Sequence, residues 1–182
     1  MKKDISEIIE VTPGVSVDLK SDQITMKSNG KEVIKKFLEN DRIKISLEGN
    51  QIKISSKKAT KRELKLVNSL ISHIKNILAG LKEEYKYTLE ICNVHFPTTV
   101  KVDGDKLKIK NFLGEKIDRV AQILPNVKAV VKGTSIEVTS PDVEAAGQTA
   151  ANFEIATKIR NRDRRVFQDG IFITSKPGRR VD

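Results

Sequence analysis

The feature of this sequence that most constrains its fold is an internal repeat with a period of about 84 residues. Residues 48–56, EGNQIKISS, lie 84 positions before residues 132–140, KGTSIEVTS, and each segment places a glycine before an alternating run that ends in serine. Pro13 and Pro97 are separated by the same 84 positions. Self-similarity at a fixed period indicates repeated structural units. The repeat therefore predicts two similarly folded units in tandem.

Alternating apolar and polar residues between turn signals predict the main strands of each unit. In the first unit these are 15–19, 24–27, 42–47 and 51–55, and in the second they are 98–102, 107–110, 127–131 and 135–139. A further segment, YKYTLEI at 85–91, lies 84 positions before DGIFITS at 169–175. We expect the former to close the first unit as the latter closes the second.

One helix is predicted in the first unit after Thr60. Its hydroxyl can cap the first turn while Glu63 returns the hydrogen bond, which is the spacing of a capping box. Apolar residues then recur at three- and four-residue intervals and form a stripe that must pack on a sheet. The members of this stripe are Leu64, Val67, Leu70, Ile71, Ile74, Ile77, Leu78 and Leu81.

The second unit is predicted to contain one helix with small side chains on its inner face. We expect it to begin with Ser140 as the cap and Pro141 at the first helical position. It continues through Val143 and Phe153. Small residues let a helix backbone approach its sheet, or a partner, more closely than leucine would. These residues are Ala145, Ala146, Gly147, Ala150 and Ala151.

Together these elements predict an α+β protein built as two tandem, similarly folded domains from an internal duplication. Each domain is expected to be a small, mostly antiparallel sheet packed with one helix. The expected domains are residues 1–91 and 92–182, without a flexible linker between them. A chain of 182 residues is long enough for two small cores.

The charge of the chain predicts an acidic partner. The formal net charge is +10 and the isoelectric point is about 9.6, a balance typical of proteins that bind nucleic acid or an anionic membrane. Residues 92–157 carry eight basic and eight acidic side chains, whereas residues 158–182 carry eight basic and three acidic ones. The excess charge of the second unit is therefore confined to its last 25 residues.

Arginine dominates this basic segment, and four of the nine arginines fall within six residues. The planar guanidinium can bind phosphate through two parallel hydrogen bonds. The candidate RNA-binding residues are Lys158, Arg160, Arg162, Arg164, Arg165, Lys176, Arg179 and Arg180. The alternative is a solvated tail. Val166–Phe172 is expected to turn at Asp169 into a strand, which would place Phe167 and Phe172 in the core rather than against bases.

Several other functional classes find little support in the sequence. Asp4, Glu7 and Glu10 interrupt the apolar residues at the start, and no apolar run reaches the roughly 18 residues of a spanning helix. We therefore expect no export and no membrane partner. The single cysteine, Cys92, excludes an internal disulfide and a cysteine-rich zinc site. Low aromatic content, at 4%, favours structured RNA over single strands.

Catalytic and metal motifs are equally sparse. His73 and His95 are the available neutral-pH bases, and they lie in different units. Residues 103–115 are similar to a calcium loop but lack its third acidic ligand and central glycine, so a hairpin turn explains them better. No Walker-type phosphate loop is present. No catalytic residue, metal or cofactor is therefore predicted.

Three classes of function remain open on these residues alone. They are a structural RNA-binding protein, an RNA-processing enzyme, and an adaptor for acidic proteins or membrane. Clustered arginines, with no group of acid and base side chains suited to catalysis, favour the structural RNA-binding protein. The enzyme hypothesis requires that His73 or His95 be essential for activity.

The segment RRVFQDGIFITSK at 164–176 resembles the end of the L6 family of large-subunit ribosomal proteins, in its archaeal and eukaryotic branch. The pattern comprises Arg165, Phe167, Asp169, Gly170, Ile171, Phe172 and Ile173. The resemblance also covers TPGVSV near the start, IKISSKKATKRE before the first helix, and SPDVEAAGQTAANFE in the second. It spans nearly the whole chain. The bacterial branch has a different segment in this region, so its contacts do not transfer residue by residue.

This resemblance implies two α+β domains in tandem and a non-enzymatic role in the cytoplasmic ribosome. It implies that the second domain binds large-subunit rRNA near the sarcin-ricin loop and the base of the factor-binding stalk. Arg160, Arg162, Arg164, Arg165 and Lys176 would carry the contact, with Lys158, Arg179 and Arg180 as further members. Neighbouring ribosomal proteins at the stalk base are expected partners, and translational GTPases are further candidates. An obligate homo-oligomer is not expected.

Overall fold

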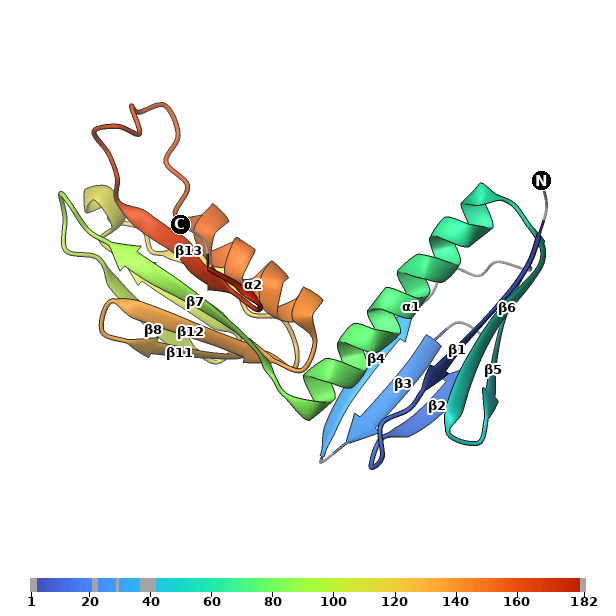
Figure 1. Cartoon of the computed structure of the whole chain (residues 1–182). Helices are drawn as coiled ribbons and strands as arrows, with labels where there is room; N and C mark the ends of the chain where they lie inside the picture. The colour runs from blue at the N-terminus through green and yellow to red at the C-terminus, as the bar shows by residue number, and fades with distance from the viewer. Residues whose placement is uncertain (1–2, 21–22, 29, 37–41, 181–182) are drawn as a thin grey trace. The chain divides into compact units, whose positions relative to one another are not determined.

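The computed structural model describes residues 3–20, 23–28, 30–36 and 42–180, and it divides the chain into two compact units (Figure 1). The first unit is Met1–Glu83 and the second is Glu84–Asp182. Each combines antiparallel strands in small sheets with one long helix. The predicted α+β architecture with a duplicated unit is therefore confirmed.

The first unit has six strands followed by a helix in its described residues. The sheets have the strand orders β1-β6-β5 and β2-β3-β4. The elements are β1 (Lys3–Glu10), β2 (Ser16–Lys20), β3 (Gln23–Ser28), β4 (Lys31–Lys36), β5 (Ile43–Glu48), β6 (Gln51–Ala59) and α1 (Lys61–Lys82). Thr60 caps α1 and Glu63 completes the capping box, as predicted.

The second unit repeats this order and adds strands after its helix. Its sheets have the orders β11-β12-β7-β13-β14 and β10-β9-β8. The elements are β7 (Tyr85–Cys92), β8 (Thr99–Asp103), β9 (Lys106–Lys110), the short 3₁₀ helix η1 (Phe112–Gly114), β10 (Arg119–Gln122), β11 (Lys128–Lys132), β12 (Ser135–Ser140), α2 (Val143–Ala156), β13 (Gly170–Lys176) and β14 (Arg179–Arg180).

Equivalent hydrogen bonds fix the correspondence between the two units. The Val11 N–H donates to the Asn50 carbonyl at 3.0 Å, and the Ile91 N–H donates to the Thr134 carbonyl at 2.8 Å. Asn50 and Thr134 are 84 positions apart, and both belong to the glycine turns that revealed the repeat. The end of β1 therefore corresponds to the end of β7.

The prediction that YKYTLEI closes the first unit is wrong. This segment is β7, which pairs with β12 on one side and β13 on the other in the second unit. Leu89 and Ile91 on β7 are buried in the second core. The boundary accordingly lies between Glu83 and Glu84, eight residues before the expected one between 91 and 92.

Further differences concern strands and a cap that the sequence did not indicate. Strands β1, β4, β10 and the two-residue β14 were not predicted. Asp142, not Ser140, caps α2, which begins at Val143. The buried Ser140 hydroxyl instead donates to the Asn126 carbonyl and accepts from the Asp142 N–H, so it holds the turn before the helix.

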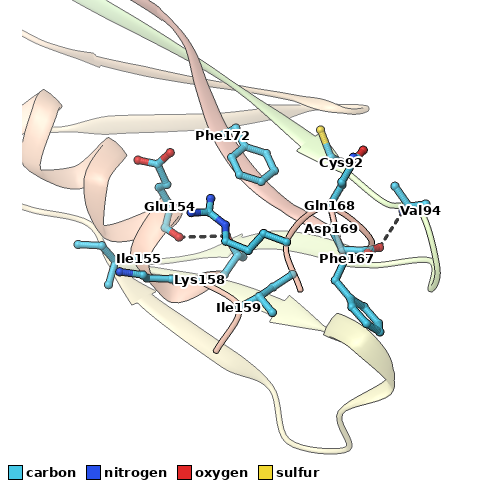
Figure 2. Close-up of a pocket in the computed structure, with 12 residues that line it drawn as sticks. Cys92, Val94, Glu154, Ile155, Lys158, Ile159, Phe167, Gln168, Asp169 and Phe172 are labelled. Carbon is cyan, nitrogen blue, oxygen red and sulfur yellow. Dashed lines mark hydrogen bonds between the residues drawn. The ribbon is translucent and has the colours of Figure 1, made fainter. Parts of the chain in front are cut away.

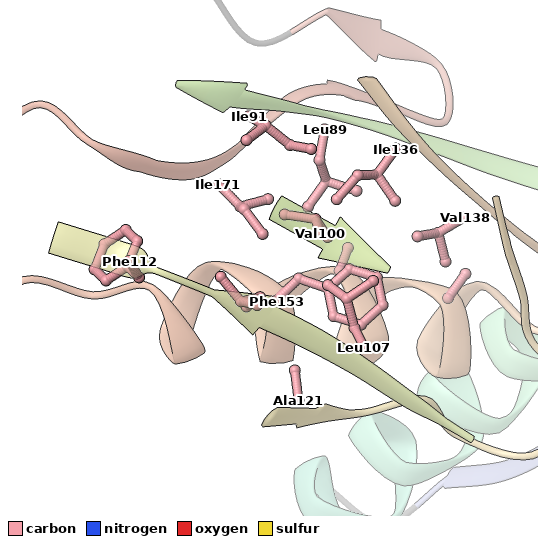
Figure 3. Packing of buried hydrophobic residues seen from close by; sticks show 13 residues of the cluster. Leu89, Ile91, Val100, Leu107, Phe112, Ala121, Ile136, Val138, Phe153 and Ile171 are labelled. Carbon is pink, nitrogen blue, oxygen red and sulfur yellow. The ribbon is translucent and has the colours of Figure 1, made fainter. Parts of the chain in front are cut away.

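Each unit has its own core. In the second, Phe153 of α2 lies in one buried cluster with strand residues that include Leu89, Leu107 and Ile136 (Figure 3). In the first, the α1 stripe buries Val67 and Ile74 among others, while Leu64 at its edge remains 41% exposed. The sheet and helix of the second unit form the rigid base from which the basic segment extends.

Candidate nucleic-acid interface

Residues 158–169, the arginine loop, connect the end of α2 to the start of β13. This loop carries five of the eight candidate RNA-binding residues, all with exposed side chains. They are Lys158, Arg160, Arg162, Arg164 and Arg165. The structure therefore brings this part of the predicted set together on one connection.

The remaining candidates lie at the far end of β13. Lys176 is exposed at the last position of this strand, and Arg179–Arg180 form β14 beside it. A strand of seven residues spans roughly 20 Å. The predicted set thus forms two groups at opposite ends of β13. The side chains of Arg179 and Arg180 lie outside the described part of the structure.

Asp163 organises the middle of the arginine loop. Its carboxylate accepts hydrogen bonds from the backbone N–H and the guanidinium of Arg165, with the Nη2–Oδ2 distance at 2.8 Å. Its carbonyl accepts from the Phe167 N–H at 2.9 Å, which closes a turn. The side-chain bond from Arg165 is the main cause that lowers the pKa of Asp163. One of the five cations is therefore partly neutralised within the loop.

Asp169 anchors the end of the loop to the chain that follows β7. Its buried carboxylate accepts from the Val94 N–H at 2.7 Å, the His95 N–H at 3.0 Å and His95 Nδ1 at 2.6 Å. Burial raises the pKa of Asp169, but these hydrogen bonds outweigh burial and lower it to about 2. The carboxylate is therefore ionised at neutral pH and joins segments 74 and 75 residues apart.

An aromatic stack supports the outer side of the same anchor. The Phe167 ring lies 4.9 Å from the His95 ring, at an interplanar angle of 28°. The Arg162 guanidinium lies 4.8 Å from the centre of the Phe167 ring, within the range of a cation–π contact. The prediction that Phe167 belongs to the core is wrong, because its half-buried ring lies in the loop and not in the apolar cluster.

A cavity of about 580 Å³ lies between the end of α2, the arginine loop and the strands β7 and β13. Figure 2 shows Phe172 and Cys92 on one side and Ile155, Lys158 and Ile159 on the other. The prediction for Phe172 is also wrong, since this ring is half-buried and lines the cavity. No local sequence pattern indicated the cavity, because its walls come from segments far apart in the chain.

Three cations of the loop are free to bind a ligand. Lys158, Arg160 and Arg164 form no salt bridge with any residue that the structure describes. Some lysines elsewhere in the second unit are paired, as in Lys108 with Asp103 at 2.5 Å and Lys132 with Glu137 at 2.8 Å. The arginine loop therefore brings three unpaired cations together on one connection, which gives it a positive potential.

The contacts around the residues considered for catalysis indicate structural roles. His95 is held by Asp169, and His73 lies on α1 in the other unit. Burial, with the charges of Glu90 and Asp169, raises the pKa of the Cys92 thiol, so that thiol is not activated as a nucleophile.

Across the described residues, no group of three or more potential ligands could hold a metal ion. Nor is any described helix long and apolar enough to cross a membrane.

Comparisons with known proteins show which family this chain resembles. The family model described as Ribosomal protein L6 matches residues 96–170, a range that includes the arginine loop. A protein of Saccharolobus solfataricus named large ribosomal subunit protein uL6 is 47% identical over 172 residues, which are 94% of this chain and 95% of that protein.

Two further relatives carry the same name. The protein of Aeropyrum pernix is 42% identical over 175 residues, with 95% of this chain and 96% of that protein covered. The protein of Methanosarcina mazei is 40% identical over 176 residues, with 97% of this chain and 99% of that protein covered. The similarity thus extends through both units.

Proposed function

We propose, from the premise that this chain belongs to the ribosomal protein L6 family, that it is a structural constituent of the large ribosomal subunit and binds rRNA through the arginine loop. The family consists of structural constituents of the cytoplasmic ribosome and not of enzymes. Membership of this family confirms the prediction of a non-enzymatic ribosomal protein.

The observation that carries the rRNA contact is the group of unpaired cations on an anchored loop. Lys158, Arg160 and Arg164 are exposed without a carboxylate partner among the described residues. Phosphate contacts supply most of the affinity in such complexes because bound cations release counterions from the RNA. A loop fixed by Asp163 and Asp169 loses less conformational entropy when it binds than a free tail would.

The finer location follows from the resemblance of the closing segment to the archaeal and eukaryotic branch. The contact would lie near the sarcin-ricin loop and the base of the factor-binding stalk. Neighbouring ribosomal proteins at the stalk base would be protein partners, and translational GTPases would act nearby. Lys176, Arg179 and Arg180, at the far end of β13, would extend the contact along the RNA.

A binding experiment with the full chain tests this proposal. The probe is a large-subunit rRNA fragment that contains the sarcin-ricin stem and its neighbouring helices, titrated across a salt series. Changing Arg160, Arg162, Arg164 and Arg165 together to Ala should weaken binding at least about tenfold. The log–log salt slope should fall by up to roughly 3, because each lost phosphate contact removes about 0.7 to 0.9.

A charge-matched control separates a local contact from the effect of net charge. Changing Lys44, Lys57, Lys61 and Lys65 to Ala removes the same charge from exposed positions of the first unit. We expect this variant to retain most of the affinity. Equal losses in the two variants would show that the arginine loop is not the site of contact.

A further inference from the structure

The cavity beside the arginine loop has the chemistry of a site for a flat, weakly polar group. Phe172 is half-buried at its wall, while Val94 and Ile155 remain 62% and 61% exposed. The raised pKa of Cys92 keeps its thiol neutral at this wall. Exposed apolar side chains that converge on one cavity are typical of a binding site.

The charged side chains at the rim of the cavity indicate which kind of ligand it would bind. Lys158 and Arg164 line the cavity, and neither makes a salt bridge with a described residue. The Asp169 carboxylate also faces this region, but its hydrogen bonds to Val94 and His95 already occupy it. Glu154 is the other acidic residue in the lining. An anion is therefore favoured on the side of Lys158 and Arg164, next to an apolar wall.

We propose that this cavity accepts one unpaired nucleotide of the bound RNA. Its base would lie against Phe172 and Ile155, and its phosphate would contact Lys158 and Arg164. Unpaired bases in RNA loops and bulges commonly stack on aromatic side chains. A cavity of about 580 Å³ is large enough for a base and its sugar. This inference rests on the proposed rRNA contact and adds a base-binding site to it.

A peptide side chain is the competing occupant, and the rim argues against it. An aliphatic or aromatic side chain would fill the apolar wall but leave Lys158 and Arg164 without a partner. A nucleotide supplies both the ring and the phosphate within one residue. The nucleotide therefore satisfies both parts of the site.

The first test is Phe172→Leu in the full chain, titrated with the same rRNA fragment across a salt series. Loss of one stacked base should weaken binding roughly 5- to 150-fold. The salt slope should stay unchanged, because no phosphate contact is removed. Phe96→Leu is the matched control, since Phe96 is 43% exposed and does not line the cavity.

A second measurement does not depend on any substitution. Cys92 is the only cysteine of the chain and lines the cavity, so its alkylation by a maleimide reports on access. Bound rRNA fragment should slow this reaction at pH 8, and prior alkylation should weaken RNA binding.

The outcomes distinguish this inference from the proposed function. If Phe172→Leu binds as the native chain does and RNA leaves the alkylation of Cys92 unchanged, the cavity does not hold a nucleotide. In that case the fourfold arginine variant would still lose affinity if the loop contacts phosphate. If the fourfold arginine variant also binds normally, the arginine loop is not the site of the rRNA contact.

Discussion

Asp169 and Gly170, at the end of the arginine loop, have separate physical roles. Asp169 is 1% exposed and joins the loop to Val94 and His95. Gly170 has a φ of 158°, and a Cβ at this position would lie 3.0 Å from the Phe172 ring. A side chain at residue 170 would therefore displace the ring that lines the cavity. The pair fixes both the loop and the cavity wall.

The ionised Asp169 should make the second unit sensitive to acid. Because the folded pKa of about 2 lies below the ordinary value of 3.8, its contribution is complete above about pH 5 and is lost as the pH falls towards 2. The shift corresponds to about 2 kcal/mol. We expect Asp169→Asn to lower the free energy of unfolding at pH 7, and the difference from the native chain to shrink between pH 5 and pH 3. Urea titrations at several pH values measure this.

Asp163 offers a control for this experiment. Its carboxylate is also ionised and hydrogen-bonded, but it pairs with an exposed arginine on the surface. Asp163→Asn should therefore change stability little, as is usual for exposed ion pairs. If the difference between Asp169→Asn and the native chain stays constant from pH 7 to pH 3, the anchor does not depend on the charge.

At the scale of elements, the small inner face of α2 sets its distance from the sheet. Ala146 and Ala150 are completely buried, and a Cβ on Gly147 would lie 2.9 Å from the Tyr87 hydroxyl on β7. The close approach predicted from these small residues is confirmed, and it is to the sheet of the same unit. The position of the helix end in turn determines where the arginine loop begins.

A larger side chain on this face should separate the helix from the sheet. We expect Ala150→Leu to destabilise the protein by about 1–3 kcal/mol, because the added atoms have no space in a packed core. Ala145→Leu is the matched control at a half-buried position of the same helix. Urea unfolding followed by circular dichroism measures both. Equal effects of the two substitutions would contradict a tight contact at Ala150.

Elements with a local sequence signal were predicted correctly. Features that depend on long-range strand pairing were not. The capping box at Thr60 and the turn-bounded strands required only neighbouring residues to recognise. Strand β7 was placed in the wrong unit because alternation shows that a segment is a strand but not which sheet it joins. The cations of the site were visible as a cluster. The cavity depends on Cys92 and Ile155 lying near Phe172, which only the fold determines.

At the scale of the whole molecule, the two units share one architecture but differ in the length of their helix. Helix α1 has 22 residues and α2 has 14, although both follow the equivalent strands β6 and β12. Where α1 continues to Lys82, the second unit leaves its helix and forms the arginine loop. The first unit stabilises itself with a longer helix, and the second uses the same stretch of chain for exposed cations.

The position of the unit boundary leads to a test with two fragments. Residues 84–182 retain β7, whereas residues 92–182 lose nearly all of it. Strand β7 is hydrogen-bonded to β12 and β13, and its Leu89 is completely buried. Its removal exposes two strand edges and leaves a gap in the core, and deletion of even one buried leucine side chain costs about 2–5 kcal/mol.

We therefore expect 84–182 to unfold cooperatively in urea and to bind the rRNA fragment with the salt slope of the full chain. The fragment 92–182 should show no cooperative transition, and its RNA binding should be weaker. Residues 1–83 should also fold, since the first core contains no residue of β7. Equal unfolding midpoints for 84–182 and 92–182 would mean that β7 is dispensable to the second unit. The arginine loop would then be held by β13, α2 and the hydrogen bonds of Asp169 to Val94 and His95.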